Sequence, residues 1–233
     1  METSGTFPTN LKLKVWEVGT PEPADWDHIA TDSTANLQAA GGFGLRANIS
    51  SLATNPAIVF SFDDYSVGGL EDEEPPTSSI VVQDDFNRTV AAGWSSANVG
   101  GPFAYYWGSA AINDFSVNGS EGVFTMSASG AARELSLDDV SVLNSLSTVT
   151  LSLSDIPSAK SYVRLYSRRV NSSSGYRGVI EIGPSGDVSL WVDRLANGSW
   201  ARVSMTDSVD LQLVADGKYH VCLLYTSPSP RDS

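Results

Sequence analysis

Apolar and polar residues alternate along much of this chain with a period of two. Clear examples are LKLKVW at 11–16, VTLSL at 149–153 and VSLWV at 188–192. Successive side chains of a β-strand point to opposite faces, so this period predicts strands with one buried face. The same pattern recurs at 58–65, 162–166, 178–182 and 209–214. A chain with this many such segments is constrained to a fold made of strands.

Turn signals separate the predicted strands. Asn197-Gly198 and Asp216-Gly217 suit tight hairpins, because these residue pairs tolerate positive φ angles. The only helical pattern lies at 32–41, where a polar N-cap candidate and a final glycine enclose one or two turns. Many short strands separated by turns predict a sandwich or a barrel. We therefore expect an all-β protein with one short helix.

Composition limits the classes of function. At 233 residues, with 41% hydrophobic and 18% charged residues, the chain has the composition of a globular protein. No apolar run reaches the roughly 18 residues that a membrane span needs. The net charge of −13 argues against nucleic acid as a partner, because nucleic acid is bound by clustered Lys and Arg. Acidic charge favours solubility and also supplies carboxylates that suit calcium.

The strand pattern stops at residues 68–83. Glycine, acidic residues and proline fill this segment, which has almost nothing to bury. Such a composition predicts an exposed, mobile linker. The four acids at 71–74 are also a candidate calcium site, but a solvated spacer is the favoured interpretation.

Two parts of the chain resemble a concanavalin A-like (laminin-G-like) jelly-roll domain of tailed-phage structural proteins and secreted actinobacterial proteins. In residues 8–67 the matching strings are PTNLKLKVWEVGTPEPADW, TDSTANLQAAGGFGL and IVFSFDDYSV. In residues 84–221 they are DDFNRTVAAGW, GSAAINDFSVNG, GYRGVIEIGPSGDVSLWV and VADGKYHV. The resemblance implies an antiparallel jelly-roll sandwich of two curved sheets.

The order of these strings predicts how the chain is divided. Residues 1–67 resemble the closing part of one jelly-roll copy, 68–83 form the acidic, Pro-rich linker, and 84–221 resemble the opening and middle part of a second copy. A jelly roll places its first and last strands side by side. We hypothesise that the two pieces associate across the linker, because each would otherwise leave a sheet edge unpaired.

The string CLLYTSPSPRD at 222–232 resembles a translated sequencing adapter. We therefore predict that 222–233 is an adapter-derived tail and exclude it from the fold prediction. The only cysteine of the chain, Cys222, falls in this tail. A chain otherwise without cysteine suits an extracellular or virion protein, although it assigns no redox compartment.

The sequence gives catalysis little support. His28 and His220 lie in different pieces, and no serine, cysteine or acid motif surrounds them. Each is more simply a surface or strand residue than a general base. Some jelly rolls are glycosidases with paired carboxylates on one strand, but the acids at 71–74 lie in a linker that holds no fixed separation. We predict that the protein is not an enzyme.

Two pairs of acids are candidate calcium ligands. Asp63 and Asp64 lie in a predicted closing strand, and Asp84 and Asp85 precede a predicted opening strand. In a closed jelly roll the two pairs are expected to approach each other, and calcium prefers such carboxylate groups. The favoured alternative is that Asp63 or Asp84 caps a turn through hydrogen bonds.

Aromatic and arginine side chains are the candidate ligand site. Trp107 and Trp200 lie beside Gly- and Ser-containing loops, where an exposed ring can stack on a sugar. Tyr105 belongs to the same aromatic cluster as Trp107, and Arg177 is a candidate partner for a sugar carboxylate. The alternatives are that the rings fill the core, as most aromatics in a sandwich do, and that the arginines only solvate the sheet.

The resemblance and these residues together favour a non-catalytic binding or structural module. The first hypothesis is a phage tail protein, a minor tail or fibre protein, that contacts carbohydrate on the host cell surface. The alternatives are a carbohydrate-binding or adhesion domain of a secreted bacterial protein and a pure spacer. The expected localisation is then extracellular or in the virion tail. The sequence does not decide whether the protein forms a homo-oligomer within a virion.

Overall fold

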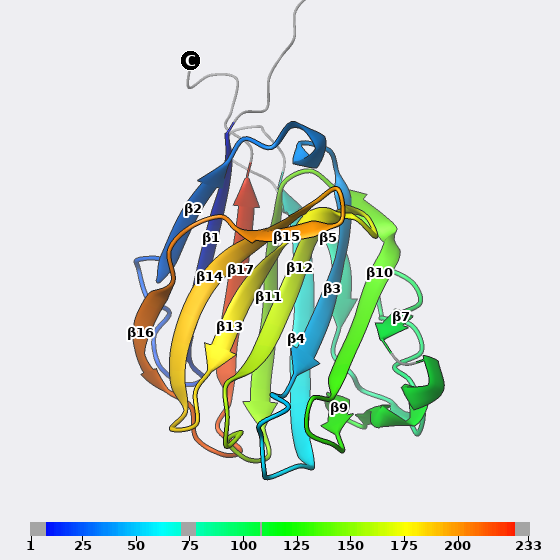
Figure 1. The fold of residues 1–233 in the computed structure, drawn as a ribbon. Coiled ribbons are helices and arrows are strands. Elements are labelled where there is room, and N and C mark those ends of the chain that lie inside the picture. Colours follow the sequence, from blue (N-terminus) through cyan, green and yellow to red (C-terminus); the bar gives the residue numbers. More distant parts are fainter. Residues whose placement is uncertain (1–7, 71–77, 108, 227–233) are drawn as a thin grey trace, which may run out of the picture.

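Two antiparallel β-sheets pack face to face (Figure 1). This computed structural model describes residues 8–70, 78–107 and 109–226, apart from the side chains of residues 78, 107 and 109–111. Strand residues dominate it, and the alternating pattern therefore predicts the fold class correctly. The fold is an all-β, jelly-roll-like sandwich.

One sheet has nine strands among the described residues, and β5 joins it through β4. In spatial order they are β2 (His28–Asp32), β1 (Thr9–Glu17), β17 (Tyr219–Thr226), β11 (Ser145–Leu153), β4 (Ile58–Leu70), β9 (Gly122–Met126), β8 (Phe115–Asn118) and β6 (Thr89–Val90), with β5 (Ser78–Asp84) beside β4.

The other sheet has eight strands in the described part of the chain, and it lies in front in Figure 1. In spatial order they are β15 (Ser199–Arg202), β14 (Asp187–Ala196), β13 (Ser174–Ile182), β12 (Ser161–Asn171), β3 (Gly41–Asn48), β10 (Ala132–Val142) and β7 (Ala104–Trp107), with β16 (Asp207–Gln212) beside β14.

The short helix expected at 32–41 is a single 3-10 turn, η1 (Ala35–Leu37). Leu37 is its only buried residue, so packing gives no reason for a longer helix. A second 3-10 segment, η2 (Ser109–Asp114), follows β7. Within the described ranges, no helix has the length and apolar character needed to cross a membrane.

In both sheets, strands from residues 9–70 pair with strands from residues 78–226. β1 pairs with β17, β3 lies between β10 and β12, and β4 lies between β9 and β11. The association hypothesised for the two pieces is therefore present in the structure, as one shared sandwich. Their origin as parts of two jelly-roll copies stays a prediction.

The expected linker is shorter than 68–83. β4 continues through Leu70 and β5 begins at Ser78, and the two strands pair with each other. The physical reason lies in the apolar residues Val67 and Val82, which are fully buried cross-strand partners. Glycine at 68 and 69 does not end the strand, because both are paired to β5. Residues 71–77, which include the four acids, lie outside the described residues.

Residues 222–226, excluded from the fold by the sequence prediction, belong to the strand β17. This strand lies between β1 and β11 and pairs with both. Leu223 and Tyr225 are buried on one face of it, at 1% and 0% exposure. The alternation of YHVCLLYT is the reason, because it continues the strand pattern past Val221. The origin of this segment stays a prediction, and residues 227–233 lie outside the described residues.

The main core lies between the two sheets and is rich in aromatic rings. Trp94 is fully buried, with its ring centroid 4.9 Å from that of Phe86, 5.0 Å from Phe124 and 5.3 Å from Phe103. Its indole N–H donates to the carbonyl oxygen of Val123 at 3.1 Å, so the polar group of the buried ring has a hydrogen-bond partner. Aromatic packing of this kind fills the interior of the sandwich between the two sheets.

Candidate functional site

Charged side chains form two rows across the outer face of the eight-stranded sheet. In the first row, Glu134 of β10, Arg46 of β3 and Arg164 of β12 are direct cross-strand partners. In the second row, Arg177 of β13 lies between Tyr166 of β12 and Asp193 of β14. Directly opposite residues of paired strands project from the same face, so the register itself brings these groups together.

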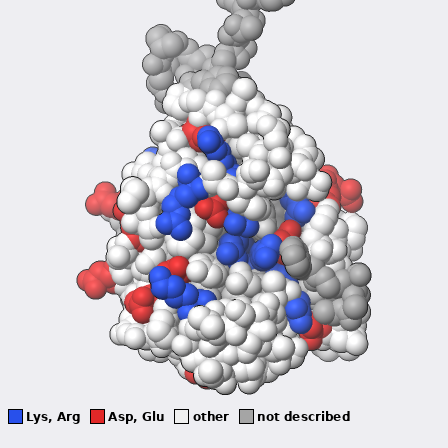
Figure 2. All heavy atoms as spheres, viewed as in Figure 1, with Lys and Arg blue, Asp and Glu red and all other residues white. Residues whose placement is uncertain are grey.

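Figure 2 shows Lys and Arg side chains gathered over the middle strands of this face, around a hollow. The hollow has a volume of about 360 Å³. Its lining residues come from seven strands and the β12–β13 turn, and they are Arg46, Tyr106, Glu134, Tyr166, Arg169, Asn171, Ser172, Ser174, Gly175, Leu195 and Trp200. A smaller hollow of about 200 Å³ adjoins it and shares Tyr106 and Arg169. We call the two hollows together the groove.

Aromatic rings lie on both sides of the groove. Trp200 is 39% exposed and Tyr106 is 44% exposed. Arginine guanidinium groups lie over both: Arg177 is 3.5 Å from the Trp200 ring centroid, and Arg169 is 3.8 Å from that of Tyr106. These stacks hold the two rings in fixed positions.

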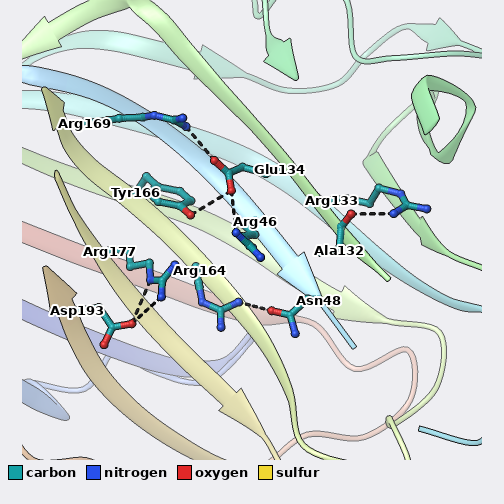
Figure 3. Close-up of polar contacts among 10 residues, drawn as sticks. All are labelled: Arg46, Asn48, Ala132, Arg133, Glu134, Arg164, Tyr166, Arg169, Arg177 and Asp193. Carbon is teal, nitrogen blue, oxygen red and sulfur yellow. Dashed lines mark hydrogen bonds and ion pairs between the residues drawn. The ribbon is translucent and has the colours of Figure 1, made fainter. Parts of the chain in front are cut away.

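Glu134 is buried at the bottom of the groove, with a side chain only 5% exposed. One carboxylate oxygen accepts from Arg169 at 3.0 Å, and the other accepts from Arg46 at 3.2 Å and from the Tyr166 hydroxyl at 3.1 Å (Figure 3). A buried carboxylate is stable only when it is paired in this way. Glu134 therefore orients three of the groove's side chains.

Asp193 does the same for Arg177. Its Oδ2 accepts from Arg177 Nε at 3.0 Å and from Nη2 at 2.9 Å, while its Oδ1 accepts from the indole N–H of Trp191 at 2.9 Å. The fixed Arg177 then stacks on Trp200. A chain of contacts from β14 through β13 to β15 thus positions the exposed indole ring.

Two of the four predicted ligand residues, Trp200 and Arg177, are brought together at the groove. Tyr105 is not at the groove, because its ring packs on Phe115 at 4.9 Å and its hydroxyl accepts from the backbone N–H of Trp94 at 2.5 Å. Since side chains alternate along β7, its neighbour Tyr106 faces the groove instead. The side chain of Trp107 lies outside the described ones.

Sequence reasoning missed Tyr166, Arg46 and Arg169 as groove residues. A signal for part of the groove exists in the segment YVRLY at 162–166, where Tyr, Arg and Tyr recur at every second position. Alternation of this kind places all three on one strand face. Arg46 carries no such signal, because its position beside Arg164 depends on the register of β3 and β12.

The structure brings the two predicted aspartate pairs to neighbouring strands. Asp84 of β5 lies opposite Tyr65 of β4, next to Asp64. Asp64 has a φ angle of 49° at a β-bulge, and its backbone N–H donates to Asp63 Oδ1 at 2.8 Å. Burial, and then the nearby Asp64 charge, raises the pKa of Asp63.

Asp84 is fully buried and has other partners. Arg88 donates to its two carboxylate oxygens at 2.6 Å and 2.8 Å, and the backbone N–H of Phe86 donates to Oδ1 at 3.0 Å. These contacts are the ones expected if Asp84 caps a turn, which is the alternative to calcium binding. In the described part of the chain, no three His, Cys, Asp or Glu side chains gather as metal ligands. Calcium binding by Asp63, Asp64, Asp84 and Asp85 stays a prediction.

His28 has a serine and an acid beside it that the sequence does not reveal. Its Nδ1 lies 2.7 Å from Asp207 Oδ2, and its Nε2 lies 2.6 Å from Ser204 Oγ. The order of atoms matches a Ser-His-Asp triad, in which the aspartate is buried and the histidine faces the substrate. Here the imidazole is 1% exposed and the Asp207 side chain is 53% exposed, which is the opposite arrangement. None of the hollows named here includes Ser204. The arrangement fits a link that fastens the β15–β16 loop to β2.

The outer face of the nine-stranded sheet has a hollow of its own, of about 270 Å³. His220 and Trp16 lie there with ring centroids 5.1 Å apart, and His220 Nδ1 is 3.3 Å from Thr150 Oγ1. Unlike the groove, this hollow contains no arginine. The groove is therefore the better candidate site.

Comparison of the chain with protein-family models, with curated proteins and with solved structures gives no match.

Proposed function

We propose that the protein is a non-catalytic carbohydrate-binding module, and that the groove is its binding site. The observation that supports this proposal is the pair of exposed rings, Trp200 and Tyr106, each fixed by an arginine at the edge of an open hollow. Sugars present flat apolar faces and equatorial hydroxyls, so they favour rings beside charged and polar groups. Asn171 and Ser172 add such polar groups between the two hollows.

We further propose that the module belongs to a phage tail protein, a minor tail or fibre protein, and contacts carbohydrate on the host cell surface. The resemblance of the sequence to phage structural domains supports this parent. The groove serves equally well in an adhesion domain of a secreted bacterial protein. A pure spacer, in contrast, needs no fixed exposed rings.

Glycan binding by the whole chain tests the proposal. The purified protein is screened on immobilised bacterial surface glycans, and the best ligand is then measured by isothermal titration calorimetry. Trp200→Ala is expected to weaken binding by about tenfold or more, since exposed aromatic anchors dominate such sites. Trp26→Ala, a half-buried indole beside Lys14 on the other sheet, is the matched control and should bind normally. Equal loss in both variants, or no glycan bound at all, would refute the proposal.

A further inference from the structure

We propose that Arg46, Arg164 and Arg177 form an anion subsite beside the groove, which selects glycans that carry a carboxylate or phosphate group. The inference deepens the proposed function and rests on it, because it assigns the class of sugar that the groove binds. It depends on three observations: the register of the strands, the partners of Arg164, and the charge balance of this face.

The register places like charges directly opposite each other. Arg46 of β3 and Arg164 of β12 are cross-strand partners, and their side chains project from the same face (Figure 3). Like charges in this position destabilise a sheet. An arrangement that costs stability in the free protein is expected where an anion offsets the cost.

Arg164 has no acidic partner of its own within the described ranges. Arg46 forms an ion pair with Glu134, and Arg177 forms one with Asp193. Arg164 donates through Nη1 to the amide oxygen of Asn48, while its buried Nε meets no hydrogen-bond acceptor among the described residues. A half-buried guanidinium without a carboxylate partner of its own can take a bound oxyanion as its counter-charge.

Charge balance on this face is positive although the chain as a whole is acidic. Around the groove, Arg46, Arg164, Arg169 and Arg177 carry four positive charges, and Glu134, Asp138 and Asp193 carry three negative ones. The net charge of the chain is −13, so this local excess runs against the rest of the molecule. Such a patch attracts anionic ligands and holds them at low ionic strength.

The electrostatics of Arg164 agree with this geometry. Burial, together with the positive charges of Arg177 and Arg46, lowers the pKa of Arg164 to about 10. The guanidinium is still protonated at neutral pH. A bound oxyanion would relieve the repulsion and restore the pKa towards its ordinary value of 12.5.

Three probes test the subsite with the full chain: an oligogalacturonate, its carboxyl-reduced neutral counterpart, and a glycerol phosphate oligomer. We expect the wild-type chain to bind at least one acidic probe about tenfold more tightly than the neutral one, with an affinity that falls as salt is added. Preference for the first or the last probe distinguishes a carboxylate from a phosphate. Equal affinity for acidic and neutral probes would overturn the subsite while leaving the proposed function in place.

Arg164→Met is the decisive variant, because it removes the charge and keeps the aliphatic stem. We expect it to lose the preference for acidic probes and to melt at the wild-type temperature or above, since the Arg46–Arg164 repulsion is gone. Arg133→Met, which removes an arginine paired with Asp114, is the matched control and should retain the preference. If Arg164→Met retains it as well, the inference is wrong.

Inorganic phosphate gives a readout that needs no glycan. Phosphate at matched ionic strength is expected to raise the melting temperature of the wild-type chain more than chloride does, and to have no such effect on Arg164→Met. If no glycan binds but this stabilisation is present, the proposed function fails and the anion subsite stands. Absence of the stabilisation in the wild-type chain overturns the subsite.

Discussion

Leu223 gives the sharpest test of whether residues 222–226 are part of the folded core. Its side chain is 1% exposed and points across the sandwich at Gly178 of β13, where an added Cβ would lie 3.2 Å from Leu223 Cδ1. Replacing Leu223 by alanine removes three carbons, worth about 2.4 kcal/mol at roughly 0.8 kcal/mol per methylene. Gly178 has no side chain that could move into the space, so a cavity is expected to remain.

The cavity raises the expected loss of unfolding free energy to about 3 kcal/mol or more, within the range known for buried leucines. For a domain of this size, that loss corresponds to a fall in melting temperature of roughly 6–12 °C. Urea unfolding followed by tryptophan fluorescence measures the free energy directly, and an unchanged slope with denaturant confirms that both chains unfold in the same way.

Leu224 is the matched control, because it is the same residue one position along β17, half-buried and facing the outside of the sheet. Leu224→Ala should cost about 1 kcal/mol or less, since little of its surface leaves a packed core. Similar losses in the two variants, or no loss in Leu223→Ala, would refute the placement of this segment in the sandwich.

Three further predictions concern ionisable groups. Burial alone would raise the pKa of Asp32, but hydrogen bonds from Tyr176, Thr34 and Arg194 outweigh it and lower the pKa below 3.8; stability is therefore present above pH 3.8 and lost as the pH falls through the folded-state value. Melting temperatures between pH 2.5 and 6 should show a shallower acid-side fall in Tyr176→Phe. Burial raises the pKa of the Cys222 thiol to about 12, so a thiol reagent at pH 8 should react only once the chain is unfolded. The predicted calcium site requires calcium to raise the melting temperature of the wild-type chain but not of a chain carrying both Asp63→Ala and Asp85→Ala; no effect on either chain ends that hypothesis.

Local pattern predicts the strands of this protein well, because alternation reports directly which face of a strand is buried. It fails at the ends of strands, because pairing with a neighbouring strand determines where a strand begins and ends. Gly68 and Gly69 favour a linker by composition, yet both pair with β5. Residues after Val221 resemble a translated sequencing adapter, yet their apolar alternation continues β17 between β1 and β11.

The candidate site is predicted only in part for a similar reason. Trp200 and Arg177 are identifiable by residue type and by their turn-rich or strand context. Their contact, at 3.5 Å, joins β13 to β15 across β14 and depends on Asp193 of β14, and no short pattern encodes it. Tyr105 and Tyr106 show the limit most clearly: one step of register decides which ring enters the core and which lines the groove.

The antiparallel pairing of β1 with β17 also has a mechanical consequence. Their register matches Asn10 with Thr226, so the outer ends of the two strands lie together. Tension applied at these two residues would peel the strands apart and break their hydrogen bonds one after another, because those bonds lie perpendicular to the strands. Attachment at Asn10 and Tyr219 would instead load the same bonds together in shear. Optical-tweezer measurements should therefore find a lower unfolding force for the first geometry. A sandwich pulled at Asn10 and Thr226 would then unfold under a modest force.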